Sequence, residues 1–215
     1  MATQLTTIEF QQKPPRSTAL WLSLCGFYLV WTLWAILLIH LKNLDHWPIR
    51  LAARMIIWGG FVLIYGAIRS NPLRELRLSW RGIIWGLAAS SLCMARLAWQ
   101  CHATHRLPAL PDTGTIANAI IAGPILAELV FRAIVFREMS TRIGTASAAV
   151  ISAVLFALIH LPYWTLAGDK SPAALASSLA GVFLLGVVLP LIYRWSATLL
   201  APIILHMLNN LASLA

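Results

Sequence analysis

Charged residues are scarce in this chain, and acidic ones are the scarcest of all. Only 11% of its 215 residues are charged, with 7 Asp and Glu against 16 Lys and Arg, while 60% are hydrophobic. A soluble domain carries about 25% charged and about 45–50% apolar residues. The shortage excludes an ordinary soluble domain. Because the apolar residues come in long blocks, we predict a polytopic integral membrane protein.

Other absences narrow the class further. The three cysteines, Cys25, Cys93 and Cys101, show no CxxC spacing and lie in or beside apolar segments, which is typical of small buried residues. The sequence has no internal repeat and no ten-residue pattern of alternating polarity that would indicate membrane strands. Its net charge of +9 forms no basic stripe interleaved with aromatics, so we expect no nucleic-acid partner.

Seven segments are apolar over nearly the length that a membrane-spanning helix needs, about 20 residues. They are residues 18–41, 51–68, 82–101, 115–136, 145–163, 172–193 and 197–214. We therefore predict an all-α helical membrane bundle of seven transmembrane helices, or eight. Residues 1–16 are polar and no cleavage site follows promptly, so we expect a cytoplasmic tail leading into a retained first helix, and a single integral membrane domain over 17–215.

The loop cations predict the orientation of the bundle. With the N-terminus inside, the cytoplasmic side holds Lys13, Arg16, Arg69, Arg74, Arg77, Arg81, Arg137, Arg142 and Arg194, and the opposite side holds Lys42, Arg50, Arg54, Arg106 and Lys170. The excess on the first side favours an inside N-terminus and an outside C-terminus.

One carboxylate lies well within a predicted span. Glu128 sits in the stretch LAELVFR, and Arg132 follows it at i+4 on nearly the same helix face. Ionisable residues inside membrane helices are costly and are functional candidates by default. Glu128 is therefore either a structural partner of Arg132 or a catalytic carboxylate, and the residues alone leave both interpretations open.

Two histidines and an amide extend this set. His160 lies near the end of segment 145–163, and His206 lies in the middle of segment 197–214 with Asn210 one turn later. Each histidine alone is also consistent with a hydrogen bond between helices. Together the groups suit hydrolysis: a carboxylate or imidazole takes a proton from water, and imidazole and amide donors hold the oxyanion. Zinc is a weaker alternative because no HExxH occurs, and we expect no metal and no cofactor.

Three short motifs, in order along the chain, carry a family resemblance. The stretches ELVFR, FALIH and APIILHMLNN, within residues 115–214, resemble the CPBP family of intramembrane glutamic endopeptidases. That family includes type 2 CAAX prenyl endopeptidases and bacteriocin self-immunity proteins. The resemblance implies that His160, preceded by Phe156, helps a glutamate to activate water. It also implies that His206 and Asn210 form the oxyanion site, and that 115–214 is the catalytic core.

The chain departs from the family pattern at one position. The family motif begins with two glutamates, and the first, credited with activating water, is Ala127 here; Glu128 and Arg132 match the second glutamate and the arginine. Neighbouring helical positions point about 100° apart, so a residue at 127 would face elsewhere than Glu128. Three explanations remain open: a deliberately inactivated variant, a divergent enzyme using Glu128 or His160 as base, or a relative that binds without cutting.

The resulting hypothesis is an intramembrane endopeptidase of a bacterial cytoplasmic membrane. Its partners would be the lipid bilayer and a membrane-anchored protein or peptide, with cleavage of a lipidated C-terminus or a transmembrane sorting tail. One rival is a non-catalytic membrane binding or immunity protein. The other is a proton-coupled transporter, which the absence of inverted repeats disfavours.

Overall fold

The computed structural model describes residues 17–40, 46–69, 71–105, 111–166 and 170–214. Within these ranges the chain is almost entirely helical and contains no strand, which confirms the all-α prediction. The predicted tail, residues 1–16, lies outside the described residues.

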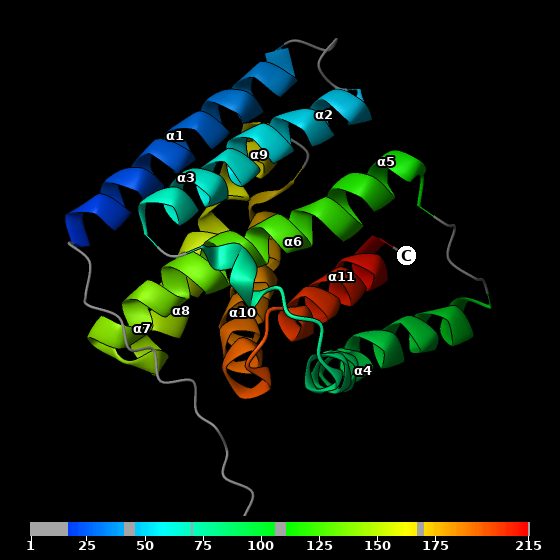
Figure 1. Cartoon of the computed structure of the whole chain (residues 1–215). Helices are drawn as coiled ribbons and strands as arrows, with labels where there is room; N and C mark the ends of the chain where they lie inside the picture. Colours follow the sequence, from blue (N-terminus) through cyan, green and yellow to red (C-terminus); the bar gives the residue numbers. More distant parts are fainter. Residues whose placement is uncertain (1–16, 41–45, 70, 106–110, 167–169, 215) are drawn as a thin grey trace, which may run out of the picture.

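Figure 1 shows the arrangement of the helices. They are α1 (Ser17–His40), α2 (Trp47–Arg54), α3 (Gly60–Ile68), α4 (Trp80–Thr104), α5 (Thr113–Thr115), α6 (Gly123–Glu128), α7 (Arg137–Ile143), α8 (Thr145–Leu158), α9 (Leu161–Leu166), α10 (Pro172–Ser196) and α11 (Leu200–Leu214). Wider π-helical segments join several of them, at Met55–Gly59, Ile116–Ala122 and Leu129–Phe136, and a 3₁₀ turn spans Pro72–Glu75.

Six helices in the described ranges are long and apolar enough to cross a membrane. The seventh predicted segment, α11, is helical but only 15 residues long. A polytopic helical membrane protein is therefore confirmed, with six long apolar helices and one shorter one. The orientation of the termini stays a prediction.

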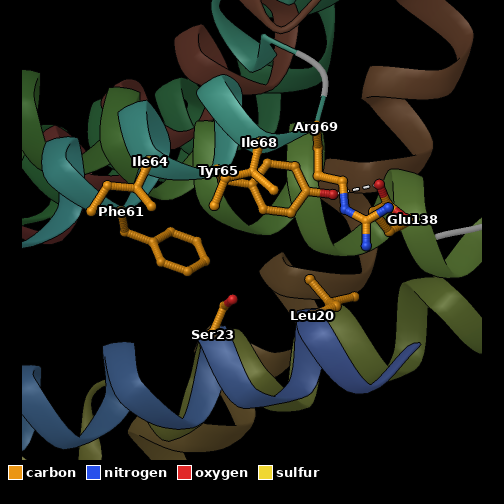
Figure 2. Close-up of a pocket in the computed structure, with 8 residues that line it drawn as sticks. All are labelled: Leu20, Ser23, Phe61, Ile64, Tyr65, Ile68, Arg69 and Glu138. Carbon is orange, nitrogen blue, oxygen red and sulfur yellow. Dashed lines mark hydrogen bonds between the residues drawn. The ribbon is translucent and has the colours of Figure 1, made fainter. Parts of the chain in front are cut away.

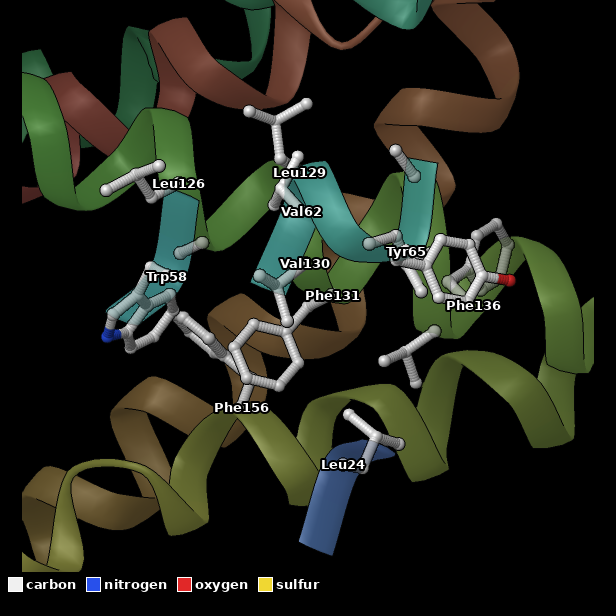
Figure 3. Packing of buried hydrophobic residues seen from close by; sticks show 14 of the residues in the cluster. Leu24, Trp58, Val62, Tyr65, Leu126, Leu129, Val130, Phe131, Phe136 and Phe156 are labelled. Carbon is white, nitrogen blue, oxygen red and sulfur yellow. The ribbon is translucent and has the colours of Figure 1, made fainter. Parts of the chain in front are cut away.

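The long helix from Thr113 to Ile143, which runs through α5, α6 and α7, forms the centre of the bundle (Figure 1). In its most apolar window 72% of the residues are buried, against 17–39% in the other membrane-length helices. Phe131 is fully buried on this helix and packs edge-on against Trp58 and Phe156 (Figure 3). Side chains on this helix consequently face protein on nearly every side.

Several helix boundaries differ from the prediction, and three of these differences have a clear local cause. The second membrane helix begins at Trp47 rather than at residue 51, with Pro48 in its first turn. Arg50 therefore lies inside the helix, as does Arg54, although both were counted among the loop cations. The predicted helix 145–163 breaks after Leu158, because Pro162 has no N–H to donate to the carbonyl of that residue.

The central helix also runs past the predicted end at residue 136. It continues to Ile143 and stops where Gly144 adopts a left-handed φ of 80°. Glycine adopts that conformation without steric cost, which makes it a common residue directly after a helix.

Candidate active site

A cavity of about 340 Å³ brings the predicted residues together. Its wall includes Ala127 from α6, His160 from the turn after α8, and His206 and Asn210 from α11. Residues separated by up to 83 positions thus share one surface, and Phe156 lines the cavity between them. The arrangement unites five of the sequence candidates without placing Glu128 in the wall.

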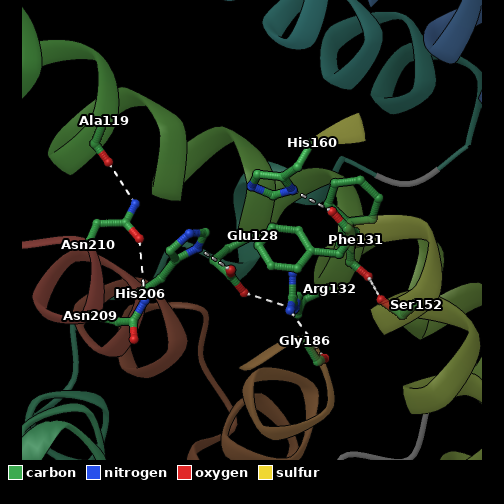
Figure 4. Close-up of polar contacts among 11 residues, drawn as sticks. Ala119, Glu128, Phe131, Arg132, Ser152, His160, Gly186, His206, Asn209 and Asn210 are labelled. Atoms are coloured by element: carbon green, nitrogen blue, oxygen red, sulfur yellow. Dashed lines mark hydrogen bonds and ion pairs between the residues drawn. The ribbon is translucent and has the colours of Figure 1, made fainter. Parts of the chain in front are cut away.

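Glu128 lies just behind the cavity, fully buried, and makes two contacts (Figure 4). Its Oε2 is 3.1 Å from Nε of Arg132, and its Oε1 is 2.9 Å from Nδ1 of His206. Each oxygen of Glu128 thus contacts one side chain, and the carboxylate fixes the positions of Arg132 and His206 relative to each other. The geometry therefore favours the structural interpretation of Glu128, extended by a second partner on α11.

Arg132 joins a further helix to this buried group. Its side chain is fully buried, and Nη2 donates to the carbonyl oxygen of Gly186 on α10 at 3.3 Å. The guanidinium carbon lies 4.6 Å from the centroid of the Phe156 ring, a cation–π contact. The close approach of α10 depends on Gly186, because a Cβ there would lie 2.9 Å from Cα of Ala153 on α8.

Hydrogen bonds define the tautomers of both histidines. Nδ1 of His160 is 3.0 Å from the carbonyl oxygen of Phe156, and a carbonyl can only accept, so Nδ1 carries the hydrogen. Nδ1 of His206 similarly donates to Glu128. In the neutral ring each Nε2 then bears a lone pair. Phe156 packs edge-on against both rings, at centroid distances of 5.3 and 5.4 Å.

The orientation of Asn210 follows from a proline on the central helix. Around Ile116–Ala122 the backbone bonds reach five residues back, as in the bond from the N–H of Gly123 to the oxygen of Asn118. The oxygen of Ala119 would accept from residue 124 in this pattern, but Pro124 has no N–H. Nδ2 of Asn210 donates to that oxygen at 2.8 Å instead (Figure 4). The amide keeps a second hydrogen that it can donate elsewhere.

Sequence reasoning missed the cations and aromatics of the same cavity. Arg50 and Arg54 line it, together with Trp31 and Trp164. Arg54 was identifiable, because it lies within an apolar segment and ionisable residues there are functional candidates. Counting it among the loop cations that set the orientation concealed this signal.

Two further observations concern metal binding and a second cavity. Among the described residues, no three His, Cys, Asp or Glu side chains converge as a metal site would need. A second cavity, of about 270 Å³, lies between α1 and α3 and has mainly apolar walls with Tyr65, Arg69 and Glu138 at one end (Figure 2). It contains none of the predicted catalytic residues.

Two comparisons with known proteins find similarity in this chain. Residues 109–212 match the family model described as type II CAAX prenyl endopeptidase Rce1-like. The chain is also 32% identical over 96 residues to the membrane-embedded CAAX protease MroQ of Staphylococcus aureus (strain USA300).

The second match covers 42% of this chain and 34% of the relative, so the aligned region spans about a third of the relative's length. No solved structure shows significant similarity to the chain. The matched region contains every residue of the candidate site that the motifs identified. Residues 109–212 are therefore similar to the CPBP family, a family of membrane proteases.

Proposed function

We propose that this chain is an intramembrane endopeptidase that hydrolyses a membrane-anchored substrate in the cavity described above. The observation that carries the proposal is that His160, His206, Asn210 and Ala127 line one cavity. Imidazole and amide groups in one cavity can move a proton from water and hold the resulting oxyanion. The substrate would be a lipidated C-terminal segment or a transmembrane sorting tail.

Each group has a distinct role in this proposal. Nε2 of His160 faces the reaction as a proton acceptor, because Nδ1 is committed to the carbonyl of Phe156. The oxyanion would accept the remaining amide hydrogen of Asn210. His206 would add a second donor in its doubly protonated form, with Nδ1–H bonded to Glu128 and Nε2–H directed at the oxyanion. Glu128 and Arg132 act from behind the wall and position His206.

Alanine at position 127 limits the rate of hydrolysis in this proposal. A carboxylate at this position would extend into the cavity toward the histidines, whereas alanine cannot accept a proton. Loss of a general base commonly lowers a rate by about 10²–10⁴-fold. We therefore expect the chain with Ala127 to cleave slowly, with His160 as the remaining base.

The test compares the chain and its Ala127→Glu variant in lipid nanodiscs, using quenched fluorescent peptides that carry a membrane anchor. The variant should cleave about 10²–10⁴-fold faster. His160→Ala in that background should abolish the gain, and Glu128→Gln should lower it together with thermal stability. Size-exclusion profiles and melting curves of each variant control for misfolding.

A second candidate function is binding without cleavage, and Ala127 is the observation that favours it. A binding or immunity protein would retain the cavity and its affinity for a membrane-anchored tail. If Ala127→Glu produces no cleavage while peptide binding persists, the peptidase proposal is wrong and the binding function stands. If Ala127→Glu does not raise the cleavage rate, and His206→Ala abolishes a cleavage that the unmodified chain shows, then Glu128 or His160 is the general base.

A further inference from the structure

We propose that Arg54 is the binding site for a carboxylate of the substrate, placed one helical turn from the reacting centre. The inference rests on the proposed function for the identity of the ligand as a peptide, but its evidence is independent of catalysis. It would define a substrate specificity that the histidines and Asn210 do not provide.

The first observation is a guanidinium in an apolar setting that lacks an anionic partner. Arg54 lies inside the membrane-length helix Trp47–Ile68 and lines the cavity. Nη1 donates to the backbone oxygen of Asn118, and the group lies 5.8 Å from the centroid of the Trp31 ring. Within the described residues no carboxylate pairs with it, and none of the cavity's lining residues is acidic.

Such a charge is costly to keep in a membrane span unless an anion joins it. A guanidinium has five N–H donors in a planar fork that matches a carboxylate through two parallel bonds. Arg54 contacts one carbonyl oxygen and one aromatic ring, so most of its N–H donors remain available to a ligand. Arg50, one turn earlier, also lines the cavity.

The second observation is that the central helix is shaped to admit this side chain. A Cβ on Gly123 would lie 2.7 Å from Nη1 of Arg54 and 2.8 Å from the oxygen of Asn118. Any residue larger than glycine would therefore displace the guanidinium. Because position 123 has no side chain, the guanidinium of Arg54 can lie against the central helix where it lines the cavity.

The spacing sets where the carboxylate would lie in a bound peptide. Gly123 and Ala127 are four residues apart on one helix, a rise of about 6 Å. An extended peptide advances about 3.3–3.6 Å per residue. A carboxylate at Arg54 would consequently fall about two residues from the bond positioned at Ala127, as either a C-terminal carboxylate or an acidic side chain.

The experiment measures binding to the unmodified full-length chain, in nanodiscs of neutral phosphatidylcholine, so it does not depend on cleavage. Two pairs of fluorescent leucine-rich peptides serve as probes. One pair ends in a free acid or an amide, and the other pair is amidated and carries a single Glu or Gln. We expect one acid form to bind about ten- to a hundredfold more tightly than its neutral twin, and the pair that shows this identifies the source of the carboxylate.

Arg54→Met should remove that preference and leave the affinity for the neutral peptides unchanged. Gly123→Ala should reduce the preference by displacing the guanidinium. Arg69→Met is the matched control, because Arg69 lines the second cavity, and it should retain the full preference.

Equal affinity for both members of each pair, or no binding of any of them, refutes the inference. Equal losses for acid and neutral peptides on Arg54→Met also refute it, because they show a structural role. In the Ala127→Glu background, an intact preference without cleavage would contradict the proposed peptidase function and leave the carboxylate site standing.

Discussion

Substituting Glu128 by glutamine separates a positioning role from a catalytic one. The change keeps the volume of the side chain and removes its charge, while Arg132 stays fully buried. Removing one member of a buried ion pair commonly costs about 3–5 kcal/mol. Since both contacts of Glu128 lie at 2.9–3.1 Å and the side chain has no exposed surface, we expect a loss in this range.

The assay is unfolding of the full chain in detergent micelles, followed by tryptophan fluorescence in a denaturant series. Arg132→Met alone should cost a similar amount, because it leaves the carboxylate buried without its cation. The double variant, Glu128→Gln with Arg132→Met, should cost clearly less than the two separate losses combined, since neither uncompensated charge remains.

Strict additivity of the two losses would refute the ion-pair reasoning. So would a Glu128→Gln variant with unchanged stability. Loss of cleavage in the Ala127→Glu background without any loss of stability would point instead to direct participation of Glu128 in the reaction.

Two further predictions concern helix packing and pH. Gly186→Ala should destabilise the protein by about 1–3 kcal/mol because its Cβ would lie 2.9 Å from Cα of Ala153, whereas Gly181→Ala on the same helix, with no atom within 4 Å, should be neutral or stabilising; denaturant unfolding compares them. Hydrogen bonds from the hydroxyl and amide of Thr115 lower the pKa of Asp112 below its usual value of about 3.9. Its stabilising contribution should be present above that value and disappear as the pH falls through the lower folded-state pKa. Amide exchange at Thr115 should then accelerate, and Asp112→Asn should remove this pH dependence.

Hydrophobic patterning alone predicted most of the helices, because a bilayer requires every span to be a long apolar helix. The i, i+4 spacing of Glu128 and Arg132 also predicted their ion pair, since that contact is local to one helix. The partnership of Glu128 with His206 was not predictable in the same way. It depends on how α11 crosses the central helix, which no periodicity within either segment specifies.

The π-helical segments and the place of Arg54 were also missed. The π-helical turn at Ile116–Ala122 cannot be recognised from the pattern of apolar residues, although the missing N–H of Pro124 is consistent with irregular backbone bonding there. Arg54 lies within the predicted segment 51–68 but was counted among the loop cations that set the orientation. The amphipathic helix α2 carries both arginines, and both line the cavity.

The ion pair between Glu128 and Arg132 has a consequence for biogenesis. Both charges belong to one helix, so the segment reaches the bilayer with those two side chains already able to neutralise each other. His206 arrives only with α11, and Gly186 with α10, and both helices follow the central helix in the order of synthesis. The central helix can therefore partition into lipid early, and the buried polar group around Glu128 is completed when α11 docks.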